Sequence, residues 1–441
     1  MKRAALHNLG CKVNAYETRA MQEMLKENGY EIVPFEETAD VYIINTCSVT
    51  NMADRKSRQM LHRAKKRNPD AVVVAAGCYV QAAGEELLKD AAVDLLIGNN
   101  EKKNLPEILQ KHEAHKKESY FHDLFHETEY ERLSLSQNEG HTRAYMKIQD
   151  GCNQFCSYCI IPYTRGRVRS RELLDIRREA QALANHGYQE IVLTGIHLDS
   201  YGVDLPEGEG DLLKVVREVG CVEGIRRIRL GSLEPRIMTE TFVRALSMEE
   251  KLCPHFHLSL QSGCDATLKR MNRRYDTEEF RACCRRLRMY FDQPALTTDV
   301  IVGFPGETEE EFARTVEFLK EICFFETHVF KYSRRKGTRA DGMEGQVQEE
   351  IKTKRSEILL ALSEANRREY QKRLIGRTVE VLMEESCIFG DTEYQIGHTR
   401  EYVPVAVAGK EPLSNQLLQV KVDDLPDFGM LCGHLGNADR K

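Results

Sequence analysis

The sequence predicts an α/β protein in three parts: an N-terminal α/β domain with a parallel sheet, a central partial (β/α)6 barrel, and a small antiparallel β-barrel at the C-terminus. The chain has 441 residues, which at roughly 150 residues per domain suggests about three domains. Short apolar runs alternate with helical patterns over most of the chain, as they do in βαβ units. After residue 376 this alternation gives way to short strands separated by Gly and Pro.

The N-terminal domain is expected over residues 1–113, followed by a linker over 114–140. In the linker, charged residues and histidines replace the periodic pattern. His112 and His115 have no cysteines nearby in sequence, so a solvated linker is favoured over a metal site. The predicted strands are 4–6, 41–44 and 72–76, with helices at 15–28 and 52–67 between them.

The central domain is expected over residues 141–372 and the C-terminal barrel over 373–438. Six strand–helix repeats are fewer than the eight that close a full β/α barrel, hence the prediction of a partial one. A charged helix at 349–374 ends the central domain. The predicted central strands are 144–148, 190–194, 227–230, 255–260, 298–302 and 325–330; the C-terminal strands are 378–383, 402–408 and 418–422.

Composition limits the possible functions. The net charge is −6, which argues against non-specific nucleic-acid binding by the chain as a whole. No apolar run approaches the ~18 residues that span a bilayer, and the first residues lack the apolar core of a signal peptide. We therefore expect a cytoplasmic protein without a membrane partner. The 14 cysteines are then not expected to form disulfides, and some should be metal ligands or catalytic thiols.

The strongest local signal is a group of three cysteines directly after predicted strand 144–148. Cys152, Cys156 and Cys159 fall within eight residues. Three thiolates can hold three irons of a 4Fe–4S cluster and leave the fourth iron open to a substrate or cofactor. Zinc is the alternative, but structural zinc sites have four ligands, and no fourth Cys or His lies nearby in sequence.

A second group of cysteines is dispersed along the chain. Cys11, Cys47 and Cys78 each follow the end of a predicted strand. The carboxyl ends of parallel strands lie at one edge of a sheet, so these three thiols are expected to converge on a single spot. The alternative is three ordinary buried cysteines.

The spacing of Cys152, Cys156 and Cys159 resembles the radical S-adenosylmethionine (SAM) superfamily. The resemblance implies that the open iron binds SAM and that an electron from the cluster cleaves it, releasing a 5′-deoxyadenosyl radical. Tyr158 matches the position beside the adenine of SAM. Further candidates for the SAM pocket lie near the ends of predicted strands: Thr194, Gly195, Ser232, Glu234, Ser259, Gln261 and Val302.

Together, the two cysteine groups make the chain similar to the methylthiotransferases, which carry a second 4Fe–4S cluster and a C-terminal RNA-binding TRAM barrel. NTCSVTNMADRKSRQ (45–59) and DGCNQFCSYCIIPYTRGRVRSR (150–171) look most like the members that act on N6-threonylcarbamoyladenosine at tRNA position 37. The resemblance implies transfer of a methylthio group to carbon 2 of that base. It also implies two SAM molecules per turnover, with an electron donor and a sulfur source of unknown identity, and no DNA partner.

Four alternatives stay open. The substrate could instead be isopentenyladenosine at tRNA position 37, or an aspartate of a ribosomal protein. Outside this family, the chain could be an iron–sulfur electron carrier without catalysis. It could also be an RNA-binding module whose cysteines hold zinc.

Basic residues predict where RNA binds. Arg165, Arg167 and Arg169 recur with period two, which on an extended segment places them on one face. Arg334 and Arg335 lie in a second basic stretch, and all five are predicted to contact RNA. From residue 376 onward the charge is −5, six basic against eleven acidic residues. The C-terminal barrel is therefore expected either to bind RNA through a small local surface or to position the other two domains.

Overall fold

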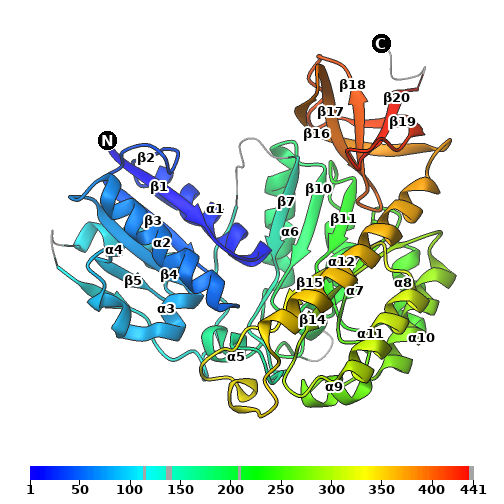
Figure 1. The fold of residues 1–441 in the computed structure, drawn as a ribbon. Helices are drawn as coiled ribbons and strands as arrows, with labels where there is room; N and C mark the ends of the chain where they lie inside the picture. The colour runs from blue at the N-terminus through cyan, green and yellow to red at the C-terminus, as the bar shows by residue number, and fades with distance from the viewer. Residues whose placement is uncertain (113–115, 136–141, 207–209, 437–441) are drawn as a thin grey trace.

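The computed structural model describes residues 1–112, 116–135, 142–206 and 210–436 (Figure 1). A parallel sheet with its helices is followed by an open barrel of strands and helices and then by a small closed barrel. This architecture confirms the predicted fold class. No described helix is both long enough and apolar enough to cross a membrane.

The first part is a six-stranded parallel sheet in the order β2-β1-β3-β4-β5-β6. Apolar side chains pack α1 (Lys12–Glu27) and α4 (Leu105–Lys111) on one face, and α2 (Asn51–Arg67) and α3 (Cys78–Ala83) on the other. Its strands are β1 (Lys2–Asn8), β2 (Tyr30–Ile32), β3 (Val41–Thr46), β4 (Val72–Gly77), β5 (Leu95–Ile97) and β6 (Glu118–Tyr120).

Strand β6 lies within the expected linker and forms an edge of this sheet. It has three residues, too few for an apolar pattern to identify it. Nδ1 of His112 lies 3.1 Å from the Glu118 carboxylate, so this histidine has a local partner. His115 lies outside the described residues.

The second part is the partial barrel. Strands β10 and β11 extend β7 in one parallel sheet, and β13, β14 and β15 run side by side in the next. Between the two sheets, a bridge joins Ile228 to Leu252. The strands are β7 (Arg143–Lys147), β10 (Glu190–Thr194), β11 (Arg227–Leu230), β12 (Ser232–Leu233), β13 (His255–Gln261), β14 (Ala295–Val302) and β15 (Glu326–Lys331).

Helices cover the outside of these strands (Figure 1). Between β7 and the first outer helix, the chain forms the short pair β8 (Gln149–Asp150) and β9 (Arg169–Ser170), which encloses the helix α5 (Ile161–Arg165). The other helices are α6 (Leu173–Asn185), α7 (Leu212–Gly220), α8 (Glu240–Ser247), α9 (Asp265–Arg270), α10 (Thr277–Tyr290), α11 (Glu309–Ile322) and α12 (Glu349–Lys372).

The third part is a closed barrel of five strands in the order β16-β17-β18-β20-β19. Its pairings are antiparallel except for β18 with β20, which is parallel. Guanidinium groups anchor it to the central strands: Nη1 of Arg227 donates to the carbonyl of His398 at 2.9 Å, and Nη2 of Arg229 donates to that of Thr399 at 2.8 Å. The strands are β16 (Thr378–Phe389), β17 (Thr392–Thr399), β18 (Pro404–Ala408), β19 (Leu417–Asp424) and β20 (Leu431–Leu435).

Candidate active site

The loop that carries Cys152, Cys156 and Cys159 follows β8 and is held by backbone hydrogen bonds. The N–H of Cys159 donates to the carbonyl of Cys156 at 2.9 Å, and the N–H of Ser157 donates to that of Met271 at 3.0 Å. Burial raises the pKa of Cys152 to about 12. A thiol in that setting stays protonated unless a metal ion supplies the compensating charge, so the donor set suits a bound metal cluster.

Gly151 shows how tightly this loop is packed. Its φ is +69°, and a Cβ added there would lie 1.8 Å from the carbonyl oxygen of Arg167. Only glycine fits this close approach. The first cysteine of the loop is thereby held against the return strand of the β8–β9 pair.

Arg273 connects the cysteine loop to the predicted SAM pocket. Its Nη1 donates to Sγ of Cys156 at 3.1 Å, and its Nη2 donates to the carboxylate of Glu234 at 2.6 Å. The same carboxylate lies 3.2 Å from Nε2 of His197. Burial raises the pKa of neighbouring Asp199 to about 7. These groups offer a cation and carboxylates to the charged amino-acid end of a SAM molecule.

Sequence reasoning missed Arg273, His197 and Asp199. Arg273 and His197 lie in loops, and Asp199 lies in the three-residue 3₁₀ helix Leu198–Ser200, so no periodicity marks any of them. His197 and Asp199 follow Gly195 closely in sequence, and this proximity to a predicted strand end was the available signal.

A cavity of about 230 Å³ lies where the N-terminal domain meets the barrel. Tyr158 and Gln261, both predicted for the SAM pocket, line it, and so does Cys159. Val49 and Thr50, which follow Cys47, contribute the opposite wall. The cavity is thus lined by a cysteine of one group and by residues that lie two and three positions after Cys47 of the other.

The other predicted SAM residues differ in placement. Thr194 is buried at the end of β10, and a Cβ on the adjacent Gly195 would lie 2.9 Å from the Gln149 side chain. The carbonyl of Ser259 faces Arg273, with the guanidinium donating at 3.5 Å. Ser232 is exposed, and Val302 is fully buried in the core.

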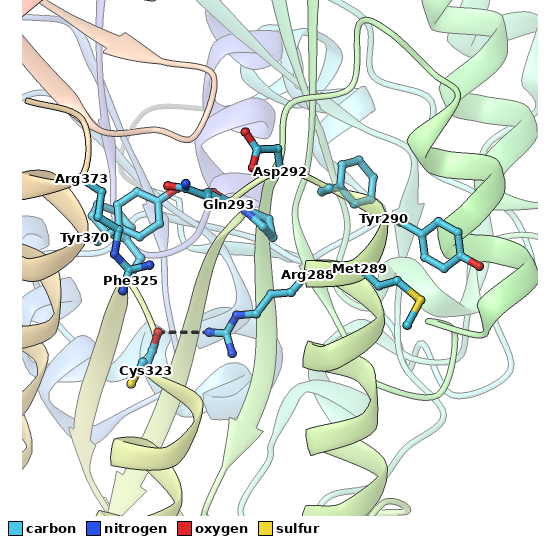
Figure 2. A pocket seen from close by; sticks show the side chains of 11 residues that line it. Arg288, Met289, Tyr290, Asp292, Gln293, Cys323, Phe325, Tyr370 and Arg373 are labelled. Atoms are coloured by element: carbon cyan, nitrogen blue, oxygen red, sulfur yellow. Dashed lines mark hydrogen bonds between the residues drawn. The ribbon is translucent and has the colours of Figure 1, made fainter. Parts of the chain in front are cut away.

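A larger cavity, about 490 Å³, lies elsewhere, beside the loop that follows α10 (Figure 2). It is lined by Tyr290, the last residue of α10, by Asp292 and Gln293 of that loop, and by Phe325 and Tyr370. None of the predicted site residues lines this cavity, and it does not border either cysteine group. Its size therefore does not make it the candidate site.

Cys11, Cys47 and Cys78 lie at the carboxyl edge of the N-terminal sheet, after β1, β3 and β4. A Cβ on Gly10 would lie 2.8 Å from Sγ of Cys47, so the first two strand ends are in contact. The Cys47 pKa, raised to about 12 chiefly by burial, also responds to the charges of Cys78 and Cys11. The three thiols thus face one region.

The spread of the sulfur atoms argues against a single zinc ion. Among the described residues, the groups of possible ligands lying within 4.8 Å of one another contain no cysteine. Sulfur ligands of one zinc ion, at 2.3 Å from the metal, lie about 3.8 Å apart. In neither cysteine triad do all three sulfur atoms lie within 4.8 Å of one another, so as placed here neither triad has the spacing of a zinc site.

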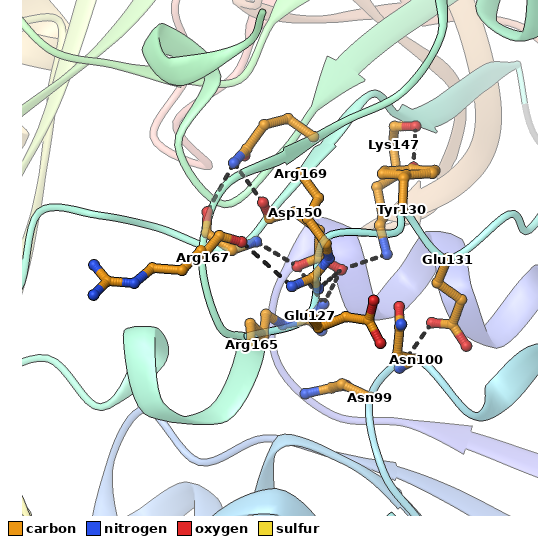
Figure 3. A network of polar contacts seen from close by, with 12 residues as sticks. Asn99, Asn100, Glu127, Tyr130, Glu131, Lys147, Asp150, Arg165, Arg167 and Arg169 are labelled. Atoms are coloured by element: carbon orange, nitrogen blue, oxygen red, sulfur yellow. Dashed lines mark hydrogen bonds and ion pairs between the residues drawn. The ribbon is translucent and has the colours of Figure 1, made fainter. Parts of the chain in front are cut away.

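A buried ionic network connects the N-terminal domain to the barrel. Figure 3 labels its barrel members Lys147, Asp150 and Arg165. Glu17 of α1 accepts from Arg165 at 2.9 Å and from Lys147 at 2.8 Å, and it pairs with Lys102 at 2.9 Å. Asp150 lies 3.1 Å from the Arg165 guanidinium and 2.7 Å from Nζ of Lys147. All five side chains are at most 3% exposed.

This network carries surplus positive charge beside Cys78. Three cations, Lys102, Lys147 and Arg165, face the two carboxylates of Glu17 and Asp150, which leaves at least one positive charge uncompensated. Nε of Arg165 donates to Sγ of Cys78 at 3.3 Å. A buried cation needs a counter-ion, and a thiolate at Cys78 would supply one.

The prediction that Arg165, Arg169 and Arg335 contact RNA is wrong. Arg165 is 0% exposed and Arg169 is 1% exposed. The segment is not extended, because Arg165 ends α5 and Gly166 turns the chain at a φ of +71°. Arg335 is buried as well, and its Nη2 donates to Asp54 of α2 at 3.1 Å.

Two of the predicted arginines remain accessible. The guanidinium of Arg167 is half-buried and lies 4.3 Å from the ring centre of Phe125 and 4.8 Å from that of Phe155. Arg334 is exposed and pairs with Asp341 at 3.1 Å.

Comparison with known proteins agrees with this geometry. Residues 146–319 match the radical SAM superfamily, and residues 3–98 match a family described as uncharacterized protein family UPF0004. The radical SAM methyltransferase TsrM from Kitasatospora setae, solved with cobalamin and a [4Fe-4S] cluster, superposes with a TM-score of 0.58 at 16% identity and covers 77% of each chain. Fold and cysteine loop thus define a radical SAM enzyme.

Full-length relatives narrow the assignment further. The threonylcarbamoyladenosine tRNA methylthiotransferase MtaB of Bacillus subtilis is 42% identical, over 96% of this chain and 94% of the relative. Its namesake from Aquifex aeolicus is 40% identical, over 87% and 93%. The tRNA-2-methylthio-N(6)-dimethylallyladenosine synthase of Alkaliphilus oremlandii is 35% identical, over 97% and 92%. The chain belongs to the radical SAM tRNA methylthiotransferase family.

Proposed function

We propose that this protein transfers a methylthio group to carbon 2 of N6-threonylcarbamoyladenosine at position 37 of tRNA. The observation that supports the proposal is the cavity lined by Cys159 of one triad and by Val49 and Thr50, which follow Cys47 of the other triad in sequence. Relatives named for this substrate are 42% and 40% identical, and the relative named for dimethylallyladenosine is 35% identical. A tRNA substrate also accords with a cytoplasmic location.

Two iron–sulfur sites follow from this proposal. Cys152, Cys156 and Cys159 would hold the cluster that binds SAM, and the strand-end triad Cys11, Cys47 and Cys78 would hold a second cluster. When bound, these groups supply the electron that cleaves SAM and the site that carries the sulfur. Two SAM molecules would be consumed per turnover, one for the radical and one for the methyl group.

The chain's own residues position these reactants. Tyr158 and Gln261 would bind the adenosine part of SAM in the cavity. Arg273 and Glu234 would bind its amino-acid part and, through Cys156, fix it relative to the cysteine loop. Thr194, Gly195, Ser232 and Ser259 would complete the pocket at the strand ends. Arg167 and Arg334 are the accessible cations that would meet the RNA backbone.

The test compares one variant of each triad. Cys152→Ala should lower the iron content from about eight to about four atoms per chain and abolish release of 5′-deoxyadenosine. Cys47→Ala should lower the iron content equally, keep 5′-deoxyadenosine release, and yield no methylthiolated tRNA. The matched control is Cys221→Ser, an exposed cysteine outside both triads.

Mass spectrometry of the tRNA nucleosides reads out the product. The proposal requires the 2-methylthio form of threonylcarbamoyladenosine from the unaltered protein and the control. A methylthio group on isopentenyladenosine instead would assign the other branch of the family. Undiminished product from folded Cys47→Ala protein, with folding checked by circular dichroism, would refute the two-cluster mechanism.

A further inference from the structure

Polar side chains occupy alternate positions along β13 on the inner wall of the barrel. His255, His257, Ser259 and Gln261 are half-exposed, whereas the residues between them are fully buried in the core. Side chains alternate between the two faces of a strand, so these four point into the barrel. Gln261 lines the cavity beside Tyr158, and His255 lies six residues, roughly 20 Å, away along the strand.

Neighbouring strands add to this wall. Nε2 of His257 lies 3.2 Å from the carboxylate of Asp299 on β14. Its ring stacks on that of His328 from β15, with centroids 5.6 Å apart. Asp299 also lines the cavity that contains Tyr158. The histidines therefore adjoin the proposed SAM pocket.

Lys12, from the N-terminal domain, lies at the His255 end of this wall. It is the first residue of α1, directly after Cys11. It lines a small cavity of about 30 Å³, enough for roughly two water-sized groups, such as the two oxygens of a carboxylate. The other residues that line this cavity are Arg143, Tyr145, Val192, Arg229, Leu230, His255 and Tyr402.

The two arginines that line this cavity with Lys12 have carboxylate partners, and Arg143 pairs with Glu384 as well as with Glu190. Arg143 and Arg229 both pair with Glu190, at 2.9 Å and 2.7 Å. Lys12 itself makes no ion pair within the described part of the chain. An anion placed here would give Lys12 the charged partner that it lacks among the described residues.

We propose that this region is an anion subsite in which Lys12 pairs with the carboxylate of the threonylcarbamoyl group of the tRNA base. The inference rests on the proposed function, and it identifies Lys12 as the residue that recognises the modified base of the substrate. A threonylcarbamoyl group carries a carboxylate four bonds beyond N6, a reach of roughly 5 Å. An isopentenyl group at the same nitrogen is apolar. Lys12 is exposed, and its ammonium group would pair with the charged substituent, whereas the apolar substituent offers it no partner.

The position of Lys12 gives this contact a second consequence. Because it follows Cys11, pairing with Lys12 would anchor the N6 substituent next to the strand-end triad. The base would then be oriented by its own modification relative to the proposed site of the sulfur.

The test measures binding of anticodon stem-loop RNAs to the anaerobic, cluster-loaded protein by fluorescence anisotropy. Three RNAs differ only at position 37: threonylcarbamoyladenosine, its neutral threonine-amide analogue, and unmodified adenosine. The unaltered protein should bind the first roughly tenfold or more tightly than the second, the range expected for a charged hydrogen bond. Lys12→Gln should abolish that preference, and Lys12→Arg should keep most of it.

Lys26→Gln is the matched control, because it removes the same charge from the far end of the same helix. Iron content and circular dichroism of each variant verify the clusters and the fold. A Lys12→Gln variant that keeps the preference for the charged RNA overturns the proposal. So does an equal loss of affinity for all three RNAs, which would mean that Lys12 contacts a phosphate.

Failure of the proposed function has a different signature. In that case the unaltered protein forms no methylthio product on threonylcarbamoyladenosine, whatever the three dissociation constants are. The binding comparison alone decides the subsite, and product analysis alone decides the reaction.

Discussion

Replacing Arg165 by methionine should destabilise the protein without weakening its electrostatic attraction to tRNA. The side chain is fully buried, donates to Glu17 at 2.9 Å and to Asn14 at 2.8 Å, and lies 3.1 Å from Asp150. Breaking a buried ion pair costs about 3–5 kcal/mol. In the variant, Lys102 and Lys147 still balance the charges of the two carboxylates. We therefore expect a loss of unfolding free energy at the lower end of this range, about 3 kcal/mol.

Calorimetry of the anaerobic protein measures this effect. For a unit of 150–250 residues, about 3 kcal/mol corresponds to a fall in Tm of roughly 6–12 °C. The control is Arg178→Met: this arginine is 70% exposed and lies 3.7 Å from Asp175, a surface pair that contributes at most about 1 kcal/mol. The salt dependence of tRNA binding should be the same in both variants and the unaltered protein. The reasoning is refuted if the Tm of Arg165→Met equals that of the control while the slope of log affinity against log salt concentration falls by about 0.9. That result would show that Arg165 neutralises a phosphate and is not a buried structural residue.

Two further predictions concern other positions. Gly10→Ala should lower the iron content toward about four atoms per chain, because the added Cβ would lie 2.7 Å from Cβ of Cys47. The control is Gly29→Ala, which has a similarly positive φ but no atom within 4 Å of the added Cβ, and it should keep its iron. Equal iron loss in both variants would show that the clash with Cys47 is not the cause. Burial alone would raise the pKa of Glu190, but Arg229 and Arg143 outweigh it and lower that pKa to about 2. Its folded pKa is below its unfolded value, so its contribution of about 3 kcal/mol is present above pH 4.5 and is lost as the pH falls toward 2. The Tm difference between the unaltered protein and Glu190→Gln should shrink over that range, and a constant difference would contradict this assignment.

Sequence patterns predicted the parts of the site that depend on local spacing. Cys152, Cys156 and Cys159 are close in the chain, so their grouping needed no knowledge of the fold. The convergence of Cys11, Cys47 and Cys78 followed from one general property, the common edge of parallel strands. Strands β5 and β6 escaped prediction, since three residues are too few to establish a period.

Charge alone could not distinguish a buried arginine from an RNA-binding one. The partner of Arg165 is Glu17, 148 residues earlier in the chain. Arg335 finds Asp54 across 281 residues. Only the docking of the two domains determines which guanidinium groups find carboxylates, and no local pattern encodes that docking.

The contrast between the two cysteine groups has a consequence for how the protein matures. The loop of Cys152, Cys156 and Cys159 can capture iron while the rest of the chain is still unfolded, because its ligands are neighbours in sequence. The other three cysteines meet only after β1, β3 and β4 have paired, a slower event that depends on contacts distant in sequence. In the proposed two-cluster enzyme, metal delivery to that edge would therefore wait for a folded sheet, and a cluster destroyed there by oxygen could be rebuilt on the folded domain. The cell would load this enzyme in two stages, one during folding and one after it.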